Sequence, residues 1–144
     1  LKIKINNSVI KILKDEEKFG IKEFQTYQKF GENIAKIKKN VNKNIKKIIK
    51  SKKKIIGYGA PAKATTALNY FGIKEEIDFI VEDNKLKHQK FVPGVKIPIF
   101  SKNKINSNNI KLIILAWNFY DEIKNQNLHI TKDIISIKEL EKDG

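Results

Sequence analysis

From residue 55 onward, short apolar runs alternate with helical patterns, an order that few folds accommodate. Helical patterns at 61–71 and 118–126 separate the runs "IIGYG" at 55–59, "IDFIVED" at 77–83, "KIPIF" at 96–100, "IKLIILAW" at 110–117 and "DIISI" at 133–137. Strands that alternate with helices form βαβ units and a parallel sheet. Pro98 has no N–H to donate, so we expect its strand at an edge. The sequence therefore predicts an α/β, Rossmann-like fold with a mainly parallel sheet flanked by helices.

The first 50 residues predict a short strand and two helices. Residues 2–5 ("KIKI") alternate as a strand does, and Ser8 is placed to cap a helix that ends at Gly20. A long helix follows, whose apolar residues recur every three or four positions and predict one buried face. These residues are Phe24, Tyr27, Phe30, Ile34, Ile37, Val41, Ile45 and Ile48. We expect residues 1–50 to pack on the core of a Rossmann-like domain at 51–144.

The net charge of +14 admits more than one interpretation. All 30 basic residues are lysine, and ten of them lie at 36–54 without one acidic residue. Arginine supplies the bidentate contacts that recognise guanine and clamp phosphate, so its absence argues against sequence-specific nucleic-acid binding. The segment is typical of a solvated helix face, which also suits an anionic partner or a neighbouring domain. Salt-sensitive binding of nucleic acid stays an alternative function.

Several classes of site and location are disfavoured. The chain has no cysteine, which excludes disulfides and thiolate metal sites and favours a reducing, cytoplasmic location. No apolar run approaches the roughly 20 residues that span a membrane. His88 and His129 have no ligand spacing around them, so we expect no metal site. The sequence has no serine on a nucleophile elbow and no paired carboxylates that suggest glycosidic chemistry. We therefore assign no catalytic residue.

The segment "GYGAPAKATT" follows a predicted strand and opens a predicted helix. Gly57, Gly59 and Ala62 fit the G-x-G-x-x-A pattern of nucleotide-binding turns. Gly57 is expected to allow a tight turn, Gly59 to let the backbone approach a ligand, and Ala62 to let the helix pack on the sheet. The N–H groups of the helix start favour a phosphate, to which Lys63 and Thr65 add a charge and a hydroxyl. The pattern is short, and a structural turn also explains it.

Two further segments are expected at the same edge of the sheet as this glycine loop. Glu82 lies 20 residues after Ala62, near where acidic residues of dinucleotide folds bind ribose hydroxyls. Trp117 and Asn118 close the fourth strand, where an indole can stack on a ring and an amide can bind a hydroxyl. Each has a structural alternative: Glu82 as a turn acid, Trp117 as a core residue and Asn118 as a helix N-cap. Their joint placement favours a binding crevice for a nucleotide or nucleotide-sugar.

The stretches "GYGAPAKATTALNY", "IDFIVEDNKLKHQKFVPGVKIPI" and "LIILAWNFYDEI" together resemble the C-terminal domain of bacterial sugar C-methyltransferases. The resemblance implies an enzyme of three parts: a zinc-binding module, a methyltransferase domain that binds S-adenosylmethionine and carries the catalytic base, and a Rossmann-like domain that helps to hold a nucleotide-linked keto-sugar. It implies that this chain is the third part, which binds no cofactor and is inactive alone. Its partners would be a nucleotide-sugar of the TDP-sugar type and the methyltransferase domain of the same polypeptide.

The glycine pattern and the resemblance together give the candidate substrate-binding residues. They are Gly57, Gly59, Ala60, Pro61, Lys63, Thr65, Glu82, Asn84, Lys87, Trp117 and Asn118. Asp83 and Glu122 also match the family's motifs. Ala64 replaces a glycine that commonly follows the loop lysine, and Gln89 stands where a glycine often ends the next turn. Both departures bear on the geometry around the ligand and remove no charged contact.

The main alternative is a domain that binds an intact dinucleotide such as NAD(P) and serves an oxidoreductase. It predicts that Glu82 holds the adenosine ribose and that NAD binds more tightly than a sugar nucleotide. Pro61 inside the loop is unusual for that fingerprint.

Overall fold

The computed structural model describes residues 6–143. The chain divides into two compact units, Leu1–Lys36 and Ile37–Gly144. The strand predicted at 2–5 lies outside the described residues. The division into a lead-in at 1–50 that packs on the core and a Rossmann-like domain at 51–144 stays a prediction.

Helix α1 (Asn7–Phe19) lies in the first unit. Its N-cap is Asn6, whose side chain accepts a hydrogen bond from the Ser8 N–H at 3.3 Å. The prediction that Ser8 is the cap is wrong, because an asparagine two positions earlier offers an acceptor of the same quality. The predicted end at Gly20 is confirmed: its φ of 77° is left-handed, and its N–H bonds the carbonyls of Glu16 and Glu17.

Helix α2 (Phe24–Lys50) begins in the first unit and ends in the second. In the second unit Val41 and Ile45 are buried, as predicted. In the first unit Phe24 and Phe30 are 79% and 65% exposed, so the prediction of one buried face is wrong there. An apolar stripe shows which side of a helix can be buried, and another element must then cover it.

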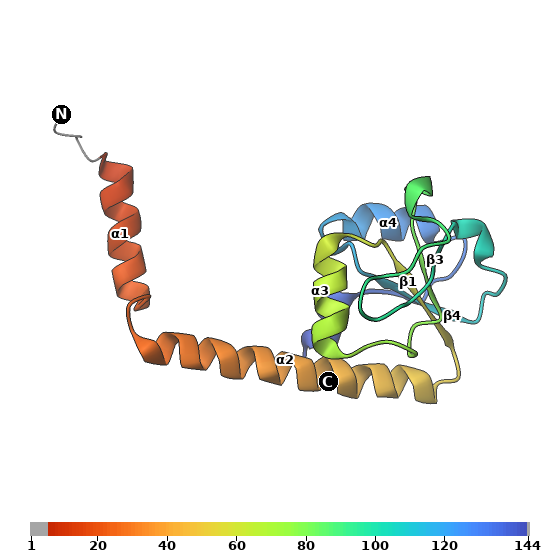
Figure 1. The fold of residues 1–144 in the computed structure, drawn as a ribbon, viewed down its shortest axis with the longest axis horizontal. Helices are drawn as coiled ribbons and strands as arrows, with labels where there is room; N and C mark the ends of the chain where they lie inside the picture. Colours follow the sequence, from red (N-terminus) through yellow and green to blue (C-terminus); the bar gives the residue numbers. More distant parts are fainter. Residues whose placement is uncertain (1–5, 144) are drawn as a thin grey trace. The chain divides into compact units, whose positions relative to one another are not determined.

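The second unit contains a five-stranded parallel sheet. Figure 1 labels three of its strands, β1, β3 and β4. The strands are β1 (Lys54–Tyr58), β2 (Phe79–Val81), β3 (Ile99–Phe100), β4 (Ile110–Ile114) and β5 (Ile134–Ser136). Their order is β3-β2-β1-β4-β5, and every neighbouring pair is parallel. The α/β, Rossmann-like fold is therefore confirmed, as is the edge position of β3.

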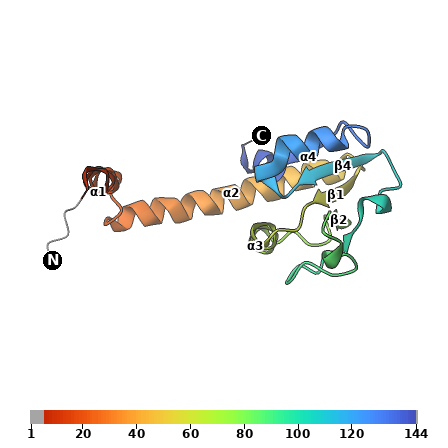
Figure 2. The ribbon, with the colours of Figure 1, turned by 90° about the horizontal axis from the view of Figure 1, so that it is seen from above.

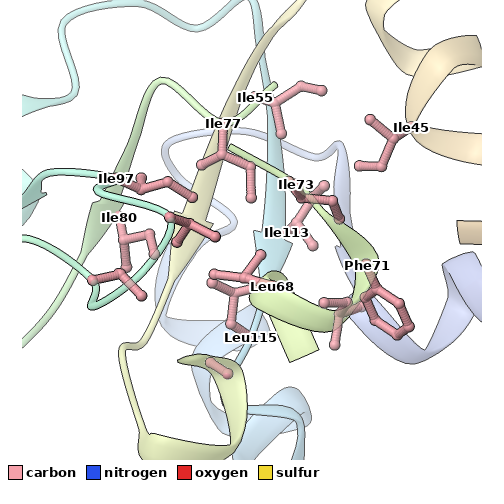
Figure 3. Packing of buried hydrophobic residues seen from close by; sticks show 14 of the residues in the cluster. Ile45, Ile55, Leu68, Phe71, Ile73, Ile77, Ile80, Ile97, Ile113 and Leu115 are labelled. Carbon is pink, nitrogen blue, oxygen red and sulfur yellow. The ribbon is translucent and has the colours of Figure 1, made fainter. Parts of the chain in front are cut away.

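Helices cover both faces of this sheet (Figure 2). Helix α3 (Ala62–Phe71) and the second half of α2 pack on one face, and α4 (Tyr120–Asn127) packs on the other. Successive residues of β1 alternate between the two cores: Ile55 packs in the first core and Ile56 in the second. Figure 3 shows the first core, in which Ile45 of α2 and Leu68 of α3 lie with Ile55.

Four short 3₁₀ helices are found within residues 37–143: η1 (Lys85–Lys87), η2 (Lys102–Lys104), η3 (Trp117–Phe119) and η4 (Ile137–Glu141). Asparagine side chains of α2 donate hydrogen bonds to carbonyls at the end of α3 and in η4. Asn42 donates to the Phe71 carbonyl at 2.9 Å, and Asn44 donates to the Leu140 carbonyl at 3.0 Å. These bonds hold the second half of α2 on the first face of the sheet.

Gly57 lies inside β1 and not in a turn, so its predicted role is wrong. A Cβ at this position would lie 2.9 Å from Ile80 Cγ1 and 2.9 Å from Leu115 Cδ1. Glycine is thus required by close packing within the first core. The predicted packing role of Ala62 is also wrong: Ala62 is exposed, and Ala64 is the buried alanine of α3. The buried face of α3 therefore begins two residues later than the pattern predicts.

Gly59 ends the strand in a left-handed conformation with a φ of 87°. A Cβ there would lie 2.7 Å from Ala116 Cβ, on the segment that follows β4. The residue therefore combines a turn that favours glycine with a close approach of two chain segments.

Candidate ligand-binding site

The strand order reverses between β1 and β4, and a pocket of about 360 Å³ lies at the carboxyl ends of these strands. Tyr58 lines it from β1, Glu82 from the end of β2, and Phe119 and Glu122 from the segment after β4. Parallel α/β folds bind ligands at such a reversal. Two larger hollows, of about 440 and 680 Å³, lie beside Asp78 at the amino ends of the strands, where this fold class does not place its ligands.

The structure brings only some of the predicted binding residues into this pocket. Gly59, Pro61, Glu82 and Lys87 line it. The other predicted residues lie outside its lining: Gly57, Ala60, Lys63, Thr65, Asn84, Trp117 and Asn118.

Glu82 and Lys87 fix both backbone polar groups of one residue of the glycine loop, Ala60. Glu82 Oε2 accepts a hydrogen bond from the Ala60 N–H at 2.9 Å, and the Lys87 ammonium donates to the Ala60 carbonyl at 3.0 Å. The two side chains pair with each other at 3.2 Å, and Glu82 Oε1 accepts from the Asn84 N–H at 3.1 Å. Both polar backbone groups of Ala60 are thus held by one ion pair, and we call Glu82 and Lys87 the Ala60 clamp.

The clamp sets the ionisation of Glu82. Burial of the carboxyl raises its pKa, but the hydrogen bonds from the Asn84 and Ala60 N–H groups and from Lys87 outweigh burial and hold the pKa below its usual 4.5. The carboxylate is therefore charged at neutral pH and already accepts three donors from the protein. This arrangement favours a bracing role for Glu82 over ribose binding.

Trp117 lies on the other face of the sheet from the pocket. Its side chain packs against the first core, whereas Tyr58 and Ile123 of the pocket belong to the second core. Two ammonium groups approach its ring: Lys63 Nζ at 4.2 Å and Lys138 Nζ at 5.2 Å from the ring centre. The sequence predicted that Trp117 and Lys63 lie near the glycine loop, and the structure brings them together as a cation–π pair.

The remaining predicted residues have mainly structural surroundings. Asn84 caps η1 by accepting a hydrogen bond from the Leu86 N–H at 3.0 Å. Thr65 is half-buried in α3. Asn118 is exposed in η3 and does not cap α4, whose N-cap is Phe119 without a side-chain bond. The alternative that Asn118 is a helix cap is therefore wrong.

Tyr58, Phe119 and Gln126 line the pocket and were not predicted. A signal for each was present in the sequence. Tyr58 is two residues after Ile56, so strand alternation places both on the face of the second core. Phe119, Glu122 and Gln126 follow helical spacing, which places their side chains along one side of α4.

The Tyr58 hydroxyl donates to both oxygens of the Asp83 carboxylate, at 2.9 and 3.1 Å. Burial of the phenol, its hydrogen bond to Asp83 and the charge of Asp83 raise the pKa of Tyr58 from 10.0 to about 12. Tyr58 is therefore a neutral donor at physiological pH and holds Asp83 at the mouth of the pocket.

One of the four tyrosines is therefore expected to titrate late, at about pH 12. The neutral phenol is the favoured form in the folded chain, so its contribution to stability is fully present below pH 10.0 and is lost as the pH rises through about 12. A phenolate absorbance titration measures the late step. Tyr58→Phe should abolish it and Tyr70→Phe should retain it. A late step that survives Tyr58→Phe would contradict the assignment.

Residues 2–136 match the family described as the C-methyltransferase C-terminal domain. The chain belongs to this family. A relative, C-methyltransferase NovU from Streptomyces niveus, is 30% identical over 121 residues, which make up 83% of this chain and 29% of NovU. This C-methyltransferase C-terminal domain thus spans less than a third of the length of that relative.

No helix within residues 6–143 is long and apolar enough to cross a membrane. The same residues contain no group of three or more histidine, cysteine or acidic side chains that could hold a metal ion.

Proposed function

We propose that this C-methyltransferase C-terminal domain binds a nucleotide-linked keto-sugar of the TDP-sugar type, for a cytoplasmic enzyme that uses S-adenosylmethionine. The observation that carries the proposal is the pocket at the reversal of the strand order, in a chain of this family. In this proposal the cofactor site and the catalytic base belong to a methyltransferase domain of the same polypeptide. The chain alone then binds substrate and transfers no methyl group.

The ammonium groups beside Trp117 support a place for the diphosphate. Lys63 lies in the first turn of α3, whose amino end favours an anion. Lys138 pairs with Glu141 at 3.1 Å, whereas Lys63 has no acidic partner within residues 6–143. We assign the diphosphate to Lys63, with the indole of Trp117 as a flat surface for an adjoining ring.

The Ala60 clamp argues against the dinucleotide alternative. That function needs a carboxylate that is free to bind both ribose hydroxyls. Glu82, the residue at the matching position, accepts from Ala60, Asn84 and Lys87 instead.

Calorimetric titration of the chain with TDP-glucose, NAD and S-adenosylmethionine tests the proposal. We expect only TDP-glucose to bind, and we expect Lys63→Ala to raise its Kd about tenfold, because one charge-assisted hydrogen bond is lost. Lys132→Ala removes an exposed lysine outside the pocket and serves as the matched control.

The outcomes separate the candidate functions. NAD binding without TDP-glucose binding would overturn the methyltransferase proposal. Equal weakening by Lys63→Ala and Lys132→Ala would indicate general attraction to a chain of charge +14 and would contradict the diphosphate site.

A further inference from the structure

The pocket is acidic in a strongly basic chain. Glu82, Asp83 and Glu122 line it, and Lys87 is its only lysine. Lys87 pairs with Glu82 inside the Ala60 clamp at 3.2 Å. The pocket therefore keeps two carboxylates, of Asp83 and Glu122, that have no cationic partner within residues 6–143.

Both carboxylates are held by neutral donors. Asp83 accepts from the Tyr58 hydroxyl at 2.9 Å, and Glu122 accepts from the Gln126 amide at 3.2 Å. An ionised carboxylate offers about four acceptor positions, so each keeps capacity for further donors. The two groups reach the pocket from different elements, Asp83 after β2 and Glu122 from α4.

This lining selects the part of a ligand that enters. A diphosphate would meet two uncompensated negative charges, which repel it. Sugar hydroxyls are donors and match the carboxylates. Phe119 and Ile123 add apolar surface for the C–H faces of a ring.

We infer that the pocket holds the hydroxyl-bearing hexose of the ligand through Asp83 and Glu122, and that the diphosphate lies outside the pocket. The inference rests on the proposed function and deepens it by orienting the substrate. Within the glycine loop, the Ala60 N–H is not free for a phosphate, because it is already bound to Glu82 at 2.9 Å.

Titration with two probes tests this orientation: TDP-glucose, which carries the hexose, and TDP, which lacks it. Asp83→Asn and Glu122→Gln keep the shape of each side chain and remove its charge. Each is expected to raise the Kd of TDP-glucose about tenfold and to leave that of TDP unchanged or lower. Asp121→Asn is the matched control, since Asp121 is an exposed acid in the same turn of α4 and lies outside the pocket.

The possible results distinguish failure of the inference from failure of the proposed function. Loss of TDP binding in Asp83→Asn and Glu122→Gln, or TDP-glucose binding that is insensitive to both, would overturn the inference and leave the proposed function standing. Failure of the unmodified chain to bind TDP-glucose would overturn the proposed function together with the inference. Glu122 is exposed on α4, so its variant tests the orientation even where Asp83→Asn disturbs the bond from Tyr58.

Discussion

Replacing Gly59 with alanine is expected to lower the free energy of unfolding by about 3 kcal/mol. A left-handed residue other than glycine costs about 1–2 kcal/mol, and overpacking adds about 1–3 kcal/mol. Both costs apply at Gly59, since its φ is 87° and the new Cβ would lie 2.7 Å from Ala116 Cβ. Urea unfolding followed by circular dichroism measures the change.

Gly72→Ala is the matched control for this experiment. Gly72 has a similar φ of 76°, and nothing lies within 4 Å of a Cβ built on it. It should show the backbone cost alone, about 1–2 kcal/mol. Equal destabilisation by the two variants would show that the contact with Ala116 is not what requires glycine at position 59.

Glu82→Ala is expected to destabilise the chain by about 2–3 kcal/mol, because a charged acceptor that is itself largely buried is removed from three donors. The Glu82 side chain is only 13% exposed, and its loss removes the acceptor of the Ala60 and Asn84 N–H groups and the ion-pair partner of the Lys87 ammonium. Amide hydrogen exchange should speed up at Ala60, because the clamp no longer holds its N–H. Urea unfolding gives the free energy.

Glu75→Ala is the control, because Glu75 is an exposed glutamate that precedes the same strand. It should change stability by less than about 0.5 kcal/mol. An unchanged stability of Glu82→Ala, accompanied by weaker ligand binding, would contradict the bracing role and restore Glu82 as a direct ligand contact.

The fold could be predicted from local patterns because the strands are short, apolar and separated by helices. Ile110 to Ile114 form a run that only a sheet covered on both faces can bury, and β4 is such a strand. Local patterns did not predict that Phe24 and Phe30 of α2 are exposed. Periodicity fixes the side of a helix that is apolar, and burial depends on a partner element that periodicity does not identify.

The site was harder to predict because each side chain had to be assigned to a face of the sheet. Trp117 lies in η3, after the end of β4, and packs against the first core together with Ile113 and Leu115. The pocket opens on the face of the second core, where Tyr58 lies. The sequence predicted that the candidate residues lie at the carboxyl edge of the sheet, where the pocket is found, but did not indicate which face carries the pocket.

The role of Glu82 shows a second limit. Its spacing from the glycine loop is that of the acidic residue in a dinucleotide fold. The structure places it at the carboxyl end of β2, beside the pocket. Its partners depend on the path of the loop, which turns the Ala60 N–H towards Glu82. A motif gives the position of a carboxylate and leaves open which donors reach it.

The two glycines of the loop also bear on how such chains are classified. Gly57 is required by Ile80 and Leu115, and Gly59 by its φ and by Ala116. Neither requirement involves a ligand, so selection for stability alone would preserve the G-x-G pattern after binding had changed or been lost. A pattern search for NAD enzymes would therefore select chains of this architecture whatever they bind. Side-chain size at positions 115 and 116 is expected to co-vary with the two glycines, because these positions pack on them. The acids at positions 83 and 122 are instead expected to vary with the ligand.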